Sequence, residues 1–271
     1  MKSPKLIFLY IFLLSAVIIT MMTMHKYIRP ELRDYKEIKA EGILRIVTEY
    51  NQSGYYVSGD TIEGFQYELC RTISKISGLE LQISPEMSLA ESFKGLEDNK
   101  YDIIARNIPV TSKIREKYLF TDPVVLNKQV LVQRTAEANN SIPPIRNQLD
   151  LAKKTLYIPG DSPALLRIGN LQHEIGDTIY VVEENRYSSE QLIIMVAKGD
   201  IDYAVCDLQI ATVSRNILPE IDVDTDISFT QLQSWAVRKE STALLDSLNY
   251  WFRIIRDNGT YDNIYKRYYK S

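Results

Sequence analysis

Cysteine and histidine are scarce in this sequence, which holds two of each among 271 residues. Cys70, Cys206, His25 and His173 are scattered along the chain, without the close spacing of metal ligands, and no thiol/imidazole or Ser/His/Asp set is visible. The sequence therefore predicts no metal site, no cofactor and no nucleophilic enzyme. Both cysteines lie in apolar periodic segments, so we expect buried thiols rather than a disulfide or a nucleophile.

An excess of charge of one sign is also missing. Thirty-two Lys and Arg stand against 35 Asp and Glu, a net charge of −3. No basic face argues for binding to nucleic acid. The hydrophobic share of 45% and the charged share of 25% are ordinary for a globular chain. The length suffices for one large domain or two modest lobes.

One long apolar run lies at the N-terminus. Residues 6–24 carry no charge and follow Lys2 and Lys5. As a helix this run would cover roughly 28 Å, enough to cross the hydrocarbon core of a bilayer. A cleavable signal peptide is the alternative, but its apolar core is usually shorter and no Ala-x-Ala site follows here. We expect residues 1–24 to form an uncleaved transmembrane signal anchor and residues 25–41 a linker.

Strand and helix patterns alternate in the first part of the chain. Residues 42–49, 79–84 and 101–105 are typical of buried strands, and residues 64–78 and 88–100 of the helices between them. This is the βαβ alternation of a parallel sheet.

A second alternation follows a polar stretch with two prolines, residues 135–148. Its expected strands are residues 155–158, 178–183 and 200–207, and its expected helices are residues 160–176 and 188–199. A further strand is expected at residues 228–239, followed by helices at 241–259 and 260–269. Two alternations that each start afresh predict two α/β lobes.

Polar residues stand at the carboxyl ends of these strands, where open α/β sheets bind ligands. In addition, Ser162 is expected to be the N-cap of a helix, where free N–H groups attract an anion. We expect Asp207 either to bind a ligand or to cap the next helix. The candidate ligand-binding residues near strand ends are Tyr50, Arg106, Asn107, Asp161, Ser162 and Asp207.

Seven segments, in this order, resemble the bacterial extracellular solute-binding protein family 3, which includes the periplasmic amino-acid-binding proteins. They are GILRIV, GFQYEL, GLEDNKYDIIA, TSKIREKYLFTDP, LAKKTLYIPGDS, GDIDYAVCD and DNGTYDNIYKRYY. The resemblance implies a two-lobed α/β clamshell, the type II periplasmic-binding-protein fold, preceded here by the transmembrane helix. The chain would cross the hinge twice, with residues 42–132 and 228–271 in lobe 1 and residues 137–225 in lobe 2.

The resemblance also implies a function. We expect a single-pass inner-membrane protein whose lobes lie in the periplasm and bind a small molecule, an amino acid or similar. Its expected partner is the permease of an ABC transporter or a sensing system. In the family, the aspartate that matches Asp207 receives the ligand ammonium, and the arginine of a T-x-x-R motif clamps the carboxylate.

The family arginine has no direct match here. Counting from Thr111, its position holds Ile114, and Arg115 comes one residue later, about 100° further round a helix. Both Thr111 and Arg115 remain candidate ligand contacts. We favour Arg106 as the clamp because it directly follows a buried strand, whereas the charged run around Arg115 is typical of a solvated helix face. An ion pair of Arg106 with Asp207 is the alternative.

The chain also resembles the solute-binding half of membrane-bound lytic transglycosylase F. Because the sequence reaches Ser271 directly after DNGTYDNIYKRYY, we expect no transglycosylase catalytic domain and only a binding role. Two alternatives stay open. One is a cell-wall-associated binding domain without a transport role. The other is an enzyme resembling cyclohexadienyl dehydratase, with a cleft carboxylate as acid–base group.

Overall fold

The computed structural model describes residues 10–21, 33–51, 53–160 and 162–269. Residues 10–21 form a helix in the first of two units, Met1–Arg33, and all other elements belong to the second unit, Asp34–Ser271. None of the helices in the described residues combines the length and apolar character needed to cross a membrane. The expected transmembrane helix also includes residues 1–9 and 22–24, which lie outside the described residues.

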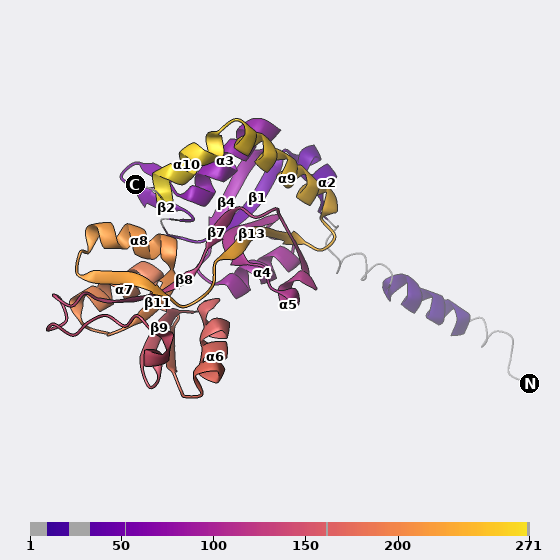
Figure 1. Cartoon of the computed structure of the whole chain (residues 1–271). Coiled ribbons are helices and arrows are strands. Elements are labelled where there is room, and N and C mark those ends of the chain that lie inside the picture. Colours follow the sequence, from indigo (N-terminus) through magenta and orange to yellow (C-terminus); the bar gives the residue numbers. More distant parts are fainter. Residues whose placement is uncertain (1–9, 22–32, 52, 161, 270–271) are drawn as a thin grey trace, which may run out of the picture. The chain divides into compact units, whose positions relative to one another are not determined.

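The first lobe is built on a mixed sheet (Figure 1). Its strands are β1 (Ile43–Thr48), β4 (Glu80–Pro85), β5 (Ile103–Pro109), β6 (Tyr118–Phe120), β7 (Val125–Asn127) and β13 (Gln231–Arg238). They lie in the order β4-β1-β5-β13-β6, and β7 also pairs with β13. The strands β1, β4 and β5 are parallel, as the alternation predicts, whereas β13 is antiparallel to its neighbours.

The helices of the first lobe follow the apolar periodicity of the sequence. They are α2 (Tyr35–Glu41), α3 (Phe65–Ser77), α4 (Leu89–Glu97), α5 (Ser112–Arg115), α9 (Thr242–Asp257) and α10 (Thr260–Tyr269). A small hairpin of β2 (Tyr56–Ser58) and β3 (Thr61–Glu63) precedes α3. Gly78 ends α3 in the left-handed conformation, with φ of 74°, at the end of the helix expected over residues 64–78.

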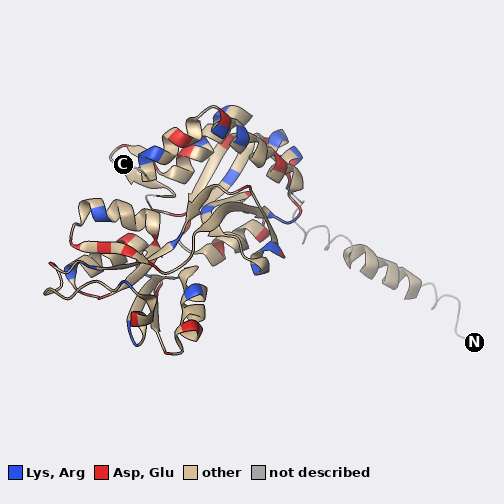
Figure 2. Cartoon of the chain, viewed as in Figure 1, with Lys and Arg blue, Asp and Glu red and all other residues tan. Residues whose placement is uncertain are grey.

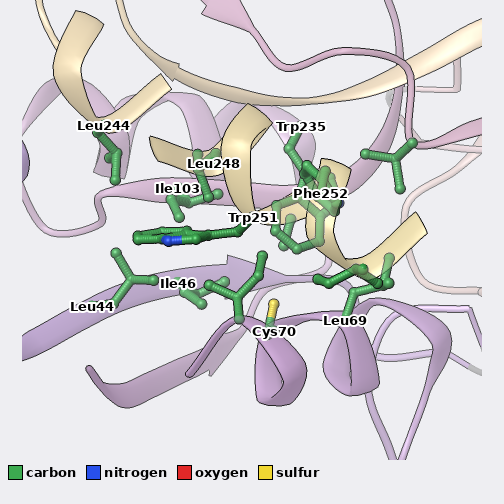
Figure 3. Close-up of a cluster of buried hydrophobic side chains, with 14 of the residues drawn as sticks. Leu44, Ile46, Leu69, Cys70, Ile103, Trp235, Leu244, Leu248, Trp251 and Phe252 are labelled. Carbon is green, nitrogen blue, oxygen red and sulfur yellow. The ribbon is translucent and has the colours of Figure 1, made fainter. Parts of the chain in front are cut away.

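The core of the first lobe lies between α9, α3 and the sheet (Figure 3). The helix expected at residues 241–259 turns one apolar face to this core, because Leu244, Leu248, Trp251 and Ile255 are all buried. Figure 3 shows Leu244, Leu248 and Trp251 beside side chains from β1, β5 and α3. Cys70 of α3 lies in this core as a free, buried thiol, as predicted.

The second lobe has its own sheet, in the order β10-β9-β11-β8-β12. The strands are β8 (Gln129–Arg134), β9 (Thr155–Pro159), β10 (Tyr180–Glu184), β11 (Ala204–Asp207) and β12 (Ile221–Asp226). The helices are η1 (Gln148–Leu151), α6 (Ala164–Ile175), α7 (Ser189–Lys198) and α8 (Leu208–Ile217). Cys206 of β11 is the second free, buried thiol.

The strand β8 belongs to the second lobe, so our range of 42–132 for the first lobe is wrong for residues 129–132. β8 pairs with β11 on one side and with β12 on the other, both antiparallel. This ladder places β8 inside the second sheet. The chain therefore crosses between the lobes from β7 to β8 and again from β12 to β13.

The acidic row along β12 is neutralised by neighbouring cations (Figure 2). Asp222 pairs with Arg146 at 2.5 Å, and Asp224 pairs with Arg215 at 2.9 Å. At the crossing, Lys128 Nζ lies 2.7 Å from Asp226 Oδ2. This last pair ties together the two segments that connect the lobes.

Candidate functional site

A polar pocket lies where the two lobes meet. Both lobes contribute to its wall, and its polar side chains include those of Glu49, Arg106, Asn107, Gln129, Ser162 and Asp207. The cavity has a volume of about 70 Å³. Small-molecule sites usually enclose about 300–1,000 Å³. A ligand of amino-acid size therefore requires the lobes to move apart before it enters.

Arg106 reaches the pocket from β5. The sequence indicated that Arg106 directly follows this strand. The strand instead continues to Pro109, so Arg106 lies within it. Arg106 Nη2 lies 3.2 Å from Glu49 Oε2, and its side chain is 10% exposed. Arg106 Nη1 donates to the carbonyl oxygens of Glu86 and Met87 at 3.4 and 3.3 Å. Its ion-pair partner is thus Glu49 of the same lobe, not Asp207.

Asp207 faces the same pocket from the second lobe, at the end of β11. Burial raises the pKa of its carboxyl group to about 7, and the negative charge of Glu49 acts in the same direction. A hydrogen bond from Gln129 Nε2 and the positive charge of Arg106 oppose this rise. Asp207 occupies the N-cap position of α8, but its side chain makes no capping hydrogen bond there. Its carboxyl group is therefore engaged by Gln129 rather than by the start of α8.

Two helices of the second lobe begin at the pocket. Ser162 Oγ accepts a hydrogen bond from the backbone N–H of Ala164 at 3.2 Å, although α6 itself has Pro163 at the N-cap, one residue later than predicted. Ser189, the first residue of α7, also lines the pocket. Helix N-termini carry partial positive charge, so this wall favours an anionic group. The candidate Asp161 lies outside the described residues.

Asn107 connects the pocket to the core through a chain of hydrogen bonds. Trp235 Nε1 donates to Gln66 Oε1 at 2.6 Å, and Gln66 Nε2 donates to Asn107 Oδ1 at 2.5 Å. Asn107 Nδ2 then donates to Ser53 Oγ at 3.1 Å, and Ser53 Oγ lies 2.8 Å from the Tyr269 hydroxyl. These partners fix the Asn107 side chain at the floor of the pocket.

Three candidates from the sequence lie away from this pocket. Thr111 caps α5, and Arg115 is exposed; both line a separate groove on the first lobe. Ile114, at the family arginine position, packs against an apolar cluster. Tyr50 is 47% exposed and stands outside the pocket lining. Their roles as ligand contacts stay predictions.

Glu49, Gln129 and Ser189 line the pocket but were missing from our candidates. Glu49 directly follows β1, so the rule that selected residues at strand ends could have found it. Gln129 opens the antiparallel strand β8 and reaches the pocket with the strand's first residue. A rule based on carboxyl ends of strands could not have found this residue.

Two α/β lobes with a charged pocket between them define the class of two-lobed solute-binding folds. The chain matches the bacterial extracellular solute-binding proteins, family 3, over residues 44–271, and it belongs to this family.

The comparisons with individual proteins agree with this family. The membrane-bound lytic murein transglycosylase F of Desulfosudis oleivorans is 30% identical over 244 residues, which cover 90% of this chain and 52% of that protein. The chain thus spans about half the length of the curated relatives it matches.

Solved structures share the fold. A mutant of ArgBP from T. maritima matches with a TM-score of 0.72 and 24% identity, covering 87% of this chain and 99% of that one. The ancestral amino-acid-binding protein AncCDT-1, described as a precursor of cyclohexadienyl dehydratase, matches with a TM-score of 0.73 and 20% identity. That match covers 86% of this chain and 98% of the other.

Proposed function

We propose that this protein binds a small, amino-acid-like ligand in the pocket between its lobes. The observation that carries the proposal is the pairing of opposite charges across the pocket. Asp207 and Glu49 suit a ligand ammonium group, and Arg106 with the N-termini of α6 and α7 suits a carboxylate. A thermal-shift panel of amino acids and amines on residues 30–271 tests it, since a ligand of the native state raises the melting temperature. A panel without any specific stabilisation would refute the proposal.

A membrane-anchored, periplasmic setting is part of the proposal. Its support is the uncharged run of residues 6–24 and the extracellular character of the family. The partner would be an ABC transporter permease or a sensing system. We expect the native protein to fractionate with the inner membrane and its N-terminus, read by mass spectrometry, to retain this run. A mature chain that begins after residue 24 would contradict the anchor.

A cell-wall-associated binding role without transport is a second candidate. The observation that favours it is the match to membrane-bound lytic murein transglycosylase F in several bacteria. Pull-down of the membrane-extracted protein would distinguish the two roles, because a permease should co-purify only under the transport role.

An enzymatic role is a third candidate, because the pKa of Asp207 is raised to about 7. A buried carboxylic acid with such a pKa suits general acid–base work. Incubation with substrates of cyclohexadienyl dehydratase would show product formation under this role and none under the binding role.

We expect the affinity for an amino-bearing ligand to rise with pH and to level off above about 7. An ammonium group needs Asp207 ionised, and the raised pKa keeps the carboxyl protonated below about 7. Affinity should therefore fall by about tenfold per pH unit below that value. Calorimetric titrations between pH 5 and 9 measure this slope.

The variants Asp207→Asn and Asp200→Asn test whether Asp207 causes this pH dependence of the affinity. Asp200 is exposed at the end of the helix that precedes β11, so its substitution removes an equal charge away from the pocket. Asp200→Asn should keep the pH slope and Asp207→Asn should lose both the slope and most of the affinity. An equal slope in Asp207→Asn would assign the titration to another group.

The raised pKa has the opposite consequence for the unliganded protein. Asp207 ionises more easily after unfolding, where its pKa returns toward 3.8. Its contribution to the free energy of unfolding is therefore fully present below about pH 4 and is lost as pH rises to about 7. Ligand binding and folding stability should thus respond to pH in opposite directions over this interval.

We also expect the lobes to move about the two crossings when ligand binds. The cavity of about 70 Å³ cannot admit an amino acid, so the unliganded protein must also populate a more open form, and the bound ligand draws the lobes together again. Small-angle scattering with and without a ligand from the thermal-shift panel should show a smaller radius of gyration in the saturated protein. An unchanged radius would exclude closure as part of binding.

A further inference from the structure

A second hollow lies along the junction of the lobes, outside the pocket just described. From the first lobe it is lined by Tyr56 and Glu63 of the β2–β3 hairpin and by the end of α10. From the second lobe it is lined by Gln209 and Val213 of α8. Its volume is about 200 Å³, and Ile210 separates it from the first pocket as a wall common to both. An occupant would touch both lobes at once.

Gln209, which lines this hollow, carries an unused hydrogen-bond acceptor. The residue is 8% exposed, and its Nε2 donates to the carbonyl oxygen of Leu126 at 3.2 Å. Within the described part of the chain, Gln209 Oε1 is buried without a hydrogen-bond partner. A buried acceptor without a donor is unfavourable. A ligand that donates a hydrogen bond here would relieve this cost.

Glu63 gives the hollow a negative charge. Its Oε2 accepts from the Tyr56 hydroxyl at 2.7 Å and its Oε1 from the Thr61 hydroxyl at 3.3 Å. Among the described residues, no lysine or arginine pairs with Glu63. Burial and the Glu63 carboxylate together raise the pKa of Tyr56 to about 12.

The neighbouring cation does not cancel this charge. Arg267, at the rim of the hollow, is held by both carboxylate oxygens of Glu68, at 2.7 and 2.9 Å. The hollow therefore combines one half-buried carboxylate with one buried, unpaired carbonyl acceptor. Both features favour a ligand group that carries positive charge and several N–H donors.

We propose that this hollow is a second binding site, which takes a guanidinium or primary ammonium group between Glu63 and Gln209. Because its walls come from both lobes, an occupant would hold the lobes together independently of the first pocket. The site thus binds a small cationic ligand in addition to the amino-acid-like ligand proposed for the first pocket.

Agmatine, which carries a guanidinium and an ammonium group, is the probe for a calorimetric test on the full chain. Glu63→Gln and Gln209→Leu should each weaken its binding to the hollow at least about tenfold, as expected for loss of a charged hydrogen bond. Glu137→Gln, which removes an exposed acid of the second lobe, should leave the affinity unchanged. Circular dichroism melts establish that each variant is folded.

The variant Asp207→Asn separates the two sites. Under our proposal, an agmatine-binding event that is sensitive to Glu63→Gln persists in Asp207→Asn. Agmatine binding that is lost in Asp207→Asn but kept in Glu63→Gln would place the probe in the first pocket and overturn the second site. The absence of any binding event at millimolar agmatine would also overturn the second site. The function proposed for the first pocket would still be tested separately, by the thermal-shift panel.

Discussion

Arg106→Lys is expected to weaken ligand binding by roughly 2–5 kcal/mol, the cost of disrupting the hydrogen-bonded contact of a desolvated charge pair. The Arg106 side chain is 10% exposed and lines the pocket between the lobes. A guanidinium can contact Glu49, backbone carbonyls and a ligand carboxylate in one plane, and a lysine ammonium cannot reproduce this geometry. Calorimetric titration of the two proteins with a ligand from the thermal-shift panel measures the difference.

Arg115→Lys is the matched control for this experiment. Arg115 is exposed and lines a groove apart from the pocket, so its substitution should change the affinity little. Circular dichroism establishes that both variants are folded. If Arg115→Lys proved the sensitive variant, the ligand carboxylate would be bound by Arg115, beside the family arginine position, and not by Arg106. If neither variant mattered, the clamp itself would be refuted.

Asp102→Asn is expected to lower the free energy of unfolding by about 3–5 kcal/mol, as loss of one partner of a buried ion pair does. Asp102 is fully buried, and Arg238 is 5% exposed. Arg238 Nη2 lies 3.3 Å from Asp102 Oδ1, and Asp102 Oδ2 accepts from the backbone N–H of Arg45 at 3.0 Å. An asparagine removes the negative charge of Asp102 from beside the buried guanidinium. Urea unfolding measures the change.

Asp246→Asn is the control for the stability experiment. Asp246 is exposed on α9, so this substitution removes one negative charge without touching a buried pair. It should change the free energy of unfolding by no more than about 0.5 kcal/mol. Equal urea concentrations at the unfolding midpoint for Asp102→Asn and the native protein would mean that the buried pair adds nothing to stability.

The alternation of strands and helices could be predicted because each element obeys a local rule. Gly78 and Gly176 end α3 and α6, and the apolar face of α9 repeats at helical spacing. The sheet to which β8 belongs could not be predicted in the same way. All but the last residue of β8 are buried, and such a strand fits the interior of either sheet. Only the long-range pairing of β8 with β11 and β12 determines the sheet to which it belongs.

Part of the candidate site could also be predicted from local rules, because these rules locate the strands that carry its residues. Arg106 and Asp207 reach the pocket because strands of both sheets point toward the lobe junction. The pairing of Arg106 with Glu49 depends on β1 and β5 lying side by side, which no local pattern encodes. The second hollow was missed because it joins α8 to the β2–β3 hairpin, which we did not expect.

The hydrogen bond of Trp235 to Gln66 has a practical consequence for spectroscopy. Trp235 and Trp251 are the two tryptophans of the sequence, and both lie in the core of the first lobe. Intrinsic tryptophan emission therefore monitors the first lobe, while the second lobe contributes no such signal. Because Trp235 connects through Gln66 to Asn107, a ligand that shifts Asn107 should change that emission without any added dye. Separate melting of the second lobe would have to be followed by circular dichroism or by a tryptophan introduced there.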